Sequence, residues 1–225
     1  PDYSTQVTNL LRITPAELKG RLEQEGVTVH PVQHLDYAFE IEGFDYLNAL
    51  DSFNEGLFYV QDAASRLAVQ CAKIPQGEDV RVLDCCAAPG GKSFAAAIAM
   101  GNKGKLRSAD IHRHKTTLIQ NGADRLGLHN ILVREQDATQ NHRTWFQKMD
   151  VVICDVPCSG YGIIRKKPDI RYKDPSEMER LPQLQLQILC EQAEYVKPGG
   201  VLMYSTCTLV RRENEAIVEA FLRHH

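Results

Sequence analysis

From residue 80 onward, short apolar runs alternate with longer segments whose apolar residues recur at helical spacing. This pattern predicts strands at 80–86, 105–110, 131–135, 151–155 and 201–205, and helices at 92–99, 112–126, 178–196 and 213–222. The sequence Lys197-Pro198-Gly199-Gly200 predicts a break before the last strand. Regular alternation is typical of a doubly wound parallel sheet, an α/β fold that binds ligands outside the carboxyl ends of its strands.

The first part of the chain has a different pattern. Thr14, Pro15 and Glu17 predict the start of a helix at 15–24, and Gly26 predicts its end. Strands are expected at 5–11 and from residue 27. We predict a small α+β appendage at 1–54 and a catalytic domain at 55–225. Near the start of the second domain we expect a helix at 61–72, with an apolar stripe formed by Ala64, Leu67, Ala68 and Cys71.

Composition narrows the class of protein. The chain has 225 residues, 43% of them hydrophobic, and no apolar run of the ~18 residues that a membrane helix needs. Its seven cysteines are an odd number without a C-x-x-C pair, which favours free thiols over a disulfide framework or a zinc site. We therefore expect a cytoplasmic protein with no membrane contact and no metal. The net charge of -3 disfavours a large nucleic-acid footprint but leaves room for a local basic patch.

The loop after the first strand of the catalytic domain carries candidate binding residues. Gly90 and Gly91 would let a ligand approach the backbone, and the next helix would offer its N-terminal amides. Lys92 and Ser93 resemble the end of a nucleotide P-loop, but that motif needs a glycine where this chain has Cys86. The alternative is a tight turn that binds nothing.

Aspartates at successive strand ends favour a particular ligand. Asp110 lies about 20 residues after the glycine turn, where an acidic residue accepts hydrogen bonds from ribose hydroxyls. Asp137 and Asp155 lie at the ends of the next two strands. A single acid at such a place is usually a helix cap, but three form a rim. This rim would repel a pyrophosphate and suits adenosine joined to a cationic sulfonium, which predicts S-adenosylmethionine as the cofactor.

Two cysteines follow strand ends beside this rim. Cys154 and Cys190 lie in apolar or helical stretches and fit the usual role of cysteine as a small buried hydrophobe. Cys158 and Cys207 lie at turns and fit that role poorly. A thiolate that adds to C6 of cytosine makes C5 able to attack a sulfonium methyl group, and a base must then remove the C5 proton. Position alone leaves open which cysteine attacks.

Three stretches, at 84–93, 155–160 and 205–207, together resemble the motifs of the RNA cytosine-C5 methyltransferase family. Residues 162–170 resemble its bacterial 16S ribosomal RNA branch, of Fmu or RsmB type. The likeness covers roughly residues 55–222 and implies a Rossmann-like S-adenosylmethionine-dependent methyltransferase that acts on RNA. It also implies a helical RNA-binding domain before residue 1 and a terminal β-hairpin, and we expect this chain to lack both.

The resemblance implies roles for individual residues. Asp110 would hold the ribose, Asp137 the adenine, and Asp155 would lie near the methyl group and the cytosine. Cys207 would be the nucleophile and Cys158 would assist product release. The thiolate of Cys207 would also have to be favoured locally, for which Lys92 and a nearby arginine are the candidates. The methionine part of the cofactor would be surrounded by Cys86, Ala87, Ala88, Pro89, Gly90, Gly91 and Lys92.

A basic cluster follows Cys158 directly and is expected to line the path of the RNA, most simply 16S ribosomal RNA. Its members are Arg165, Lys166, Lys167, Arg171 and Lys173. Such a cluster is otherwise ordinary solvated surface. Transfer RNA or another RNA as the substrate, and a non-catalytic RNA-binding fragment, stay open as alternatives.

Two further classes of enzyme fit less well. A nicotinamide oxidoreductase is disfavoured because the chain lacks a G-x-G-x-x-G sequence. An enzyme that methylates an amino nitrogen commonly has Asn/Asp-Pro-Pro-aromatic after the fourth strand, where this chain has Asp155-Val156-Pro157-Cys158.

Overall fold

A five-stranded parallel sheet forms the larger part of the protein. The computed structural model describes residues 5–172, 174–223 and 225. The strands lie in the order β7-β6-β5-β8-β9, and every neighbouring pair is parallel. Their bounds are Arg81–Asp84 (β5), Lys105–Asp110 (β6), Ile131–Glu135 (β7), Met149–Asp155 (β8) and Val196–Ser205 (β9). This order confirms the predicted doubly wound, Rossmann-like α/β fold.

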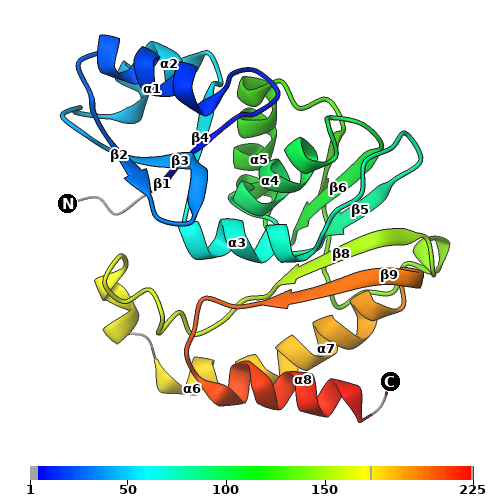
Figure 1. Cartoon of the computed structure of the whole chain (residues 1–225). Helices are drawn as coiled ribbons and strands as arrows, with labels where there is room; N and C mark the ends of the chain where they lie inside the picture. The colour runs from blue at the N-terminus through cyan, green and yellow to red at the C-terminus, as the bar shows by residue number, and fades with distance from the viewer. Residues whose placement is uncertain (1–4, 173, 224) are drawn as a thin grey trace.

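Helices cover both faces of this sheet (Figure 1). On one side lie α3 (Ala63–Cys71), α4 (Gly91–Ala99) and α5 (Arg113–Leu126), and on the other α7 (Leu181–Ala193) and α8 (Glu215–Leu222). A hydrophobic core lies on each face of the sheet, and neighbouring residues of β5 pack into different cores. Val82 packs on the side of α4 and α5, and Leu83 packs on the side of α7 and α8. A short helix α6 (Pro175–Glu179) precedes α7, and four 3-10 turns lie at Leu47–Ala49 (η1), Arg143–Trp145 (η2), Pro168–Tyr172 (η3) and Arg211–Glu213 (η4).

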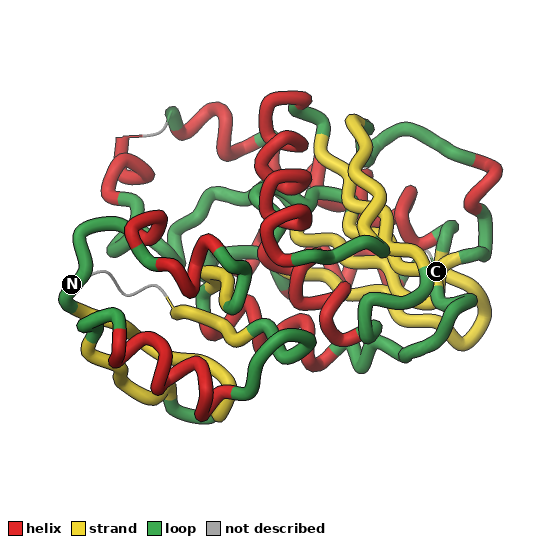
Figure 2. Tube along the Cα trace, turned by 90° about the horizontal axis from the view of Figure 1, so that it is seen from above, coloured by secondary structure: helices red, strands yellow, loops and turns green. Residues whose placement is uncertain are grey.

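The chain before the parallel sheet forms a smaller antiparallel sheet of four strands. Figure 2 shows the two sheets as separate groups of strands. Its order is β2-β3-β1-β4, with bounds Thr28–Val32, Leu35–Glu42, Thr5–Thr8 and Phe58–Gln61 respectively. Helices α1 (Pro15–Gln24) and α2 (Asp51–Asn54) accompany it. The bounds of α1 and its Thr14–Glu17 capping box are as predicted. Strands β3 and β4 were not predicted, and β4 joins the small sheet although it lies beyond the expected boundary at residue 54.

Two local predictions are wrong. In α3 the stripe residues Ala64, Leu67 and Cys71 are exposed and Ala68 is partly buried, whereas Val69 is only 2% exposed. The helix packs on α4 through the face that carries Val69, and in an alanine-rich helix the spacing of apolar residues does not single out one face. The expected break at 197–200 lies inside β9. Gly199 adopts a φ of 78° there and the register against β8 shifts, so a bulge absorbs the extra residues and the strand continues.

Asn9 joins the small sheet to the large layer. Its side chain is fully buried and its amide donates to the carbonyl oxygens of Gly56 and Leu126, both at 3.0 Å. Arg125, one residue before Leu126, donates to the carbonyl oxygens of Phe53 and Phe58. The helix α5 and the segment before β4 are therefore held together by buried hydrogen bonds.

We expect Asn9→Ala to lower the free energy of unfolding by about 2–6 kcal/mol, because two buried carbonyl oxygens would lose their partner at about 1–3 kcal/mol each. Urea denaturation followed by circular dichroism measures this change. The matched control is Asn54→Ala, which removes an exposed amide that donates to the carbonyl oxygen of Asn48. Equal, small losses for both variants would contradict the bridging role of Asn9.

Candidate active site

The loops that follow β5, β6, β8 and β9 meet at the carboxyl edge of the large sheet. The β5–α4 loop, residues 85–90, turns sharply at Gly90, whose φ is 115°. A Cβ atom on Gly90 would lie 2.5 Å from the ring of Phe94, so no other residue fits without moving that buried ring. The backbone therefore turns tightly into α4, whose first residue is Gly91.

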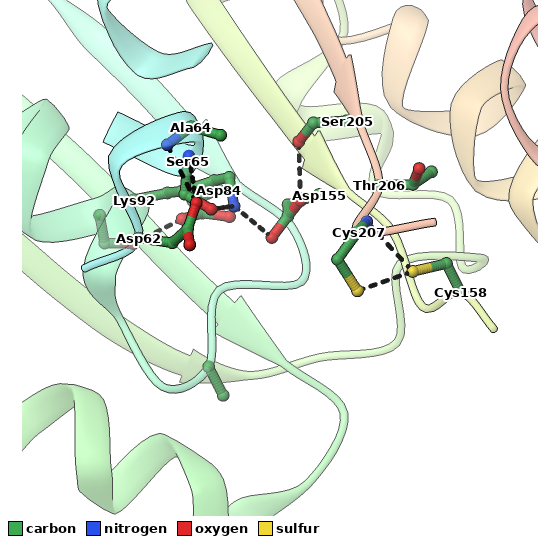
Figure 3. Close-up of polar contacts among 12 residues, drawn as sticks. Asp62, Ala64, Ser65, Asp84, Lys92, Asp155, Cys158, Ser205, Thr206 and Cys207 are labelled. Atoms are coloured by element: carbon green, nitrogen blue, oxygen red, sulfur yellow. Dashed lines mark hydrogen bonds and ion pairs between the residues drawn. The ribbon is translucent and has the colours of Figure 1, made fainter. Parts of the chain in front are cut away.

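Asp155, the last residue of β8, links that strand to α4 and to β9 (Figure 3). Its Oδ2 accepts a hydrogen bond of 2.6 Å from Nζ of Lys92, and its Oδ1 accepts one of 2.7 Å from Oγ of Ser205. The Lys92 ammonium also reaches Oγ of Ser65 in α3 at 3.4 Å. These contacts hold the carboxylate in one orientation at the strand end.

Cys158 and Cys207 face each other three residues after β8 and two residues after β9 (Figure 3). Their sulfur atoms are 3.0 Å apart, and both cysteines are free thiols. The backbone N–H of Cys207 donates to the sulfur of Cys158 at 3.2 Å. The side chain of Cys207 is the more exposed of the two.

The contact between the two thiols moves their pKa values in opposite directions. The hydrogen bond from the Cys207 thiol, together with backbone N–H groups, lowers the pKa of Cys158 from about 9 to about 7. The same hydrogen bond raises the pKa of Cys207, and the negative charge of Asp155 adds to this effect. The pair therefore shares one proton above pH 7 and acts as one titrating unit. Lys92 donates its hydrogen bonds to Asp155 and Ser65, and among the described residues the structure shows none from Lys92 to Cys207.

A buried polar layer supports the cysteine loops. Glu213 in η4 is fully buried, and its Oε2 accepts from the backbone N–H of Ser159 and from the Gln185 amide, both at 2.9 Å. The hydroxyl groups of Ser159 and Thr208 are 2.8 Å apart, which joins the residues that follow the two cysteines. Sequence reasoning missed Glu213, because it lies among charged neighbours that resemble solvated surface.

The predicted cofactor residues lie along the same edge. Asp110 ends β6 and is 8% exposed, and its carboxylate accepts from the backbone N–H groups of Ala88 and His112. Asp137 lies two residues beyond β7, and backbone and hydroxyl hydrogen bonds from Thr139 lower its pKa. The remaining predicted residues, Cys86, Ala87, Ala88, Pro89, Gly90, Gly91 and Lys92, form the β5–α4 loop and the first turn of α4.

Two groups near this loop were missing from the prediction. Asp84, at the end of β5, is fully buried, and burial raises its pKa to about 7. Gln61, at the end of β4, is 7% exposed, and neither polar atom of its amide has a partner among the described residues. A Cβ on Gly91 would lie 3.4 Å from that amide, so Gln61 borders the loop. No pattern in the sequence indicated Gln61, because only the small sheet brings it there.

The basic cluster lies on the surface between Cys158 and α6. Arg165, Lys166, Lys167 and Arg171 are exposed, and Lys173 lies outside the described residues. Lys166 forms an ion pair with Asp62, which also caps α3. The cluster is therefore attached to the helix that carries Ser65. Within the described part of the chain, no group of three acidic, cysteine or histidine side chains is placed to hold a metal ion. No helix there is long and apolar enough to cross a membrane.

Comparison with known proteins identifies the family. The family model for the 16S rRNA methyltransferases RsmB/F matches residues 70–225. The chain belongs to the RsmB/F family. It is 40% identical to a probable ribosomal RNA small subunit methyltransferase B of Bacillus subtilis, over 100% of this chain and 50% of that protein. It is 31% identical to the ribosomal RNA small subunit methyltransferase F of Shewanella loihica, over 93% of this chain and 44% of that protein.

The RsmB/F fold is also found in solved structures. A methyltransferase homolog protein from Pyrococcus horikoshii superposes with a TM-score of 0.84 and 28% identity, over 98% of this chain and 69% of that one. The chain spans about half the length of the curated relatives it matches. The shared part contains both sheets and all the loops described above.

We expect alkylation of the cysteine pair by iodoacetamide to rise with pH through a midpoint near 7, because the thiolate forms above the pKa of Cys158. In Cys207→Ala the thiol donor is lost, so the midpoint for Cys158 should move up toward about 9. Peptide mass mapping measures each site, with exposed Cys71 as the reference for reagent activity. An unchanged midpoint in Cys207→Ala would mean that the thiol contact does not set the pKa.

Proposed function

We propose that this chain catalyses methylation of C5 of cytosine in 16S ribosomal RNA, with S-adenosylmethionine as the methyl donor and a covalent bond between cysteine and C6. The observation that carries the proposal is the 3.0 Å contact between Cys158 and Cys207 beside the fixed carboxylate of Asp155. Membership of the RsmB/F family and the names of its relatives support ribosomal RNA as the substrate. Such a substrate places the enzyme in the cytoplasm, with RNA as its partner.

The residues present suit S-adenosylmethionine. The unpartnered amide of Gln61 beside Gly91 and the first N–H groups of α4 can bind the polar methionine end. Asp110 and Asp137 are placed to accept hydrogen bonds from the ribose and the adenine, and Asp155 carries negative charge near a sulfonium. When bound, the cofactor supplies an electrophilic methyl group. The chain's own residues must then make C5 nucleophilic.

The cysteine pair can generate that nucleophile. The Cys158 thiolate takes the proton of Cys207 across their 3.0 Å contact, and the exposed Cys207 thiolate adds to C6. The electron pair of the C5–C6 double bond then makes C5 the reactive carbon. Asp155, held by Lys92 and Ser205, is placed to bind the polar edge of the base during this addition.

Release needs a base and a leaving group. After methylation, C5 carries one proton too many, and its removal reforms the C5–C6 double bond and expels the Cys207 thiolate. Cys158 lies beside the sulfur of Cys207 and, once its own proton has passed to solvent, can take the C5 proton. In the adduct the Cys207 sulfur has no proton to donate, so the backbone N–H groups that also lower the pKa of Cys158 are what favour its thiolate as the base.

Replacement of Asp110 tests the cofactor site. We expect Asp110→Ala to weaken S-adenosylmethionine binding by about 1–3 kcal/mol, because hydrogen-bonding groups lose their partner. Isothermal calorimetry measures the affinity, and thermal unfolding without cofactor reports separately on the loop that Asp110 holds. Asp124→Ala, at an exposed position of α5, is the matched control. Unchanged affinity in Asp110→Ala would contradict the assignment.

The two cysteines should fail in different ways. Cys207→Ala should form neither adduct nor product, because no thiolate reaches C6. Cys158→Ala should still transfer the methyl group, more slowly because the Cys207 proton must pass to solvent, and then accumulate as a protein–RNA conjugate, because release is impaired. Denaturing gels and labelled cofactor measure the two outcomes with 16S ribosomal RNA, and Cys71→Ala is the control.

A conjugate from Cys207→Ala and none from Cys158→Ala would reverse the two roles. Full turnover in both variants would exclude covalent catalysis by this pair. RNA binding without methylation by the unmodified protein would favour a non-catalytic RNA-binding function.

A further inference from the structure

A basic cavity lies at the amino ends of the strands of the large sheet, at the edge opposite the active site. Its volume is about 270 Å³. Arg81 begins β5, Lys105 begins β6, and both contribute to its wall, together with Arg107 and Lys148. The arrowheads of β8 and β9 in Figure 1 point away from this edge. Four cationic side chains therefore surround one hollow.

The charges in this cavity are not neutralised by the protein. None of the four side chains forms an ion pair with any residue that the structure describes. No acidic residue lines the cavity. The nearby Asp150 accepts from the backbone N–H of Arg81 and pairs with Lys197 instead. The chain as a whole has a net charge of -3, so these four side chains are a local concentration of positive charge. They repel one another, and a bound anion would relieve that repulsion.

Trp145 fixes one of the cations in place. The guanidinium of Arg107 lies 4.8 Å from the centre of the Trp145 ring, which also stacks on His142. Burial lowers the pKa of Arg107, and the charges of Arg134 and Arg81 lower it further. A guanidinium held this way presents its donors to a ligand with little loss of side-chain entropy, as phosphate recognition requires.

An exposed aromatic ring beside the cavity favours a nucleic acid over a free phosphate ion. Phe146 follows Trp145, is 49% exposed, and lines a neighbouring hollow of about 350 Å³ together with Arg143 and Glu194. A base can stack on such a ring while the adjoining phosphates enter the basic cavity. A free phosphate ion has no ring that could stack on Phe146.

The cavity is separate from the active site. Met149 lines the cavity and Asp155 lies in the active site, at the two ends of β8. With about 3.3 Å per residue, the strand spaces the two sites about 20 Å apart. A strand of only a few nucleotides with its cytosine at Cys207 would end short of the cavity, whereas a folded RNA can reach both places.

We propose that this cavity binds phosphates of a second RNA segment, remote from the cytosine that is methylated. The proposal rests on RNA being the substrate, as in the proposed function. The second contact orients a folded RNA on the enzyme, and the cysteines act on a different part of that RNA.

The test compares the double variant Lys105→Gln/Lys148→Gln with the unmodified chain. Its matched control is Lys19→Gln/Lys73→Gln, which removes the same charge from exposed positions elsewhere. Binding is measured by fluorescence anisotropy at several salt concentrations. One probe is a folded fragment of 16S ribosomal RNA and the other a short single strand with the target cytosine. Methyl transfer is measured with both probes.

For the folded RNA, the double variant should lose about two- to fivefold in affinity per removed charge. The slope of log affinity against log salt should fall by about 0.7 per lost phosphate contact. KM for the folded RNA should rise while kcat stays, and the short strand should behave as with the unmodified chain. Phe146→Leu should lower affinity for the folded RNA without changing the salt slope, because stacking releases no counterions.

Three results would overturn the proposal while leaving the proposed function intact. They are an unchanged salt slope in the double variant, an equal change in the control pair, and pyrophosphate binding that the double variant abolishes without any effect on RNA. If the unmodified protein neither binds nor methylates RNA, the proposed function fails and this proposal fails with it.

Discussion

The parallel pairing of β8 with β9 is the constraint on which the active site depends. Asp155 and Ser205 are register partners at the last step of this ladder, so the two strands end at the same level. The chain leaves the sheet at two neighbouring points, and Cys158 and Cys207 follow within three and two residues. A 3.0 Å sulfur contact between residues 49 positions apart in the chain is a direct result. The hydrogen bond from Ser205 to Asp155 reinforces the same register through side chains.

The Lys92–Asp155 ion pair and the cysteine pair have separate hydrogen-bond partners at this edge. The only cation that contacts Asp155 among the described residues is Lys92, and their ion pair keeps both groups in place. The thiolate instead depends on the neighbouring thiol and on backbone N–H groups, which are fixed by the loops themselves. Below them, Glu213 accepts two buried hydrogen bonds and prevents the Cys158 loop from moving independently of η4. In the proposed mechanism rigid loops matter, because proton transfer between the two sulfur atoms requires that their contact persists.

The small sheet contributes to the site and is more than an attachment. Its last strand, β4, ends at Gln61, and the residues that follow start α3. This short segment brings Gln61 to the β5–α4 loop, Asp62 to the basic cluster and Ser65 to Lys92. Asn9, through buried hydrogen bonds, and Arg125, through partly buried ones, hold the two layers together at backbone carbonyls. The positions of three polar groups at the active site thus depend on the packing of an antiparallel sheet far from the cysteines in sequence.

The sequence by itself determined the alternation of strands and helices, the bounds of α1, β6 and β7, and the position of Asp110 and Asp155 at strand ends, with Cys158 and Cys207 just beyond the last two strands. These features depend on local periodicity, on capping residues and on glycines, which act over a few positions. Tertiary structure decided what depends on contacts between distant segments: the pairing of β3 and β4, the buried face of α3, and the continuation of β9 through a bulge. It also decided that Lys92 bonds Asp155 and that Cys158 has the lowered pKa, because a pKa follows from neighbours in space. Gln61, Glu213 and the basic cavity were absent from the sequence pattern for the same reason: their residues are scattered along the chain and only the folded sheets bring them together.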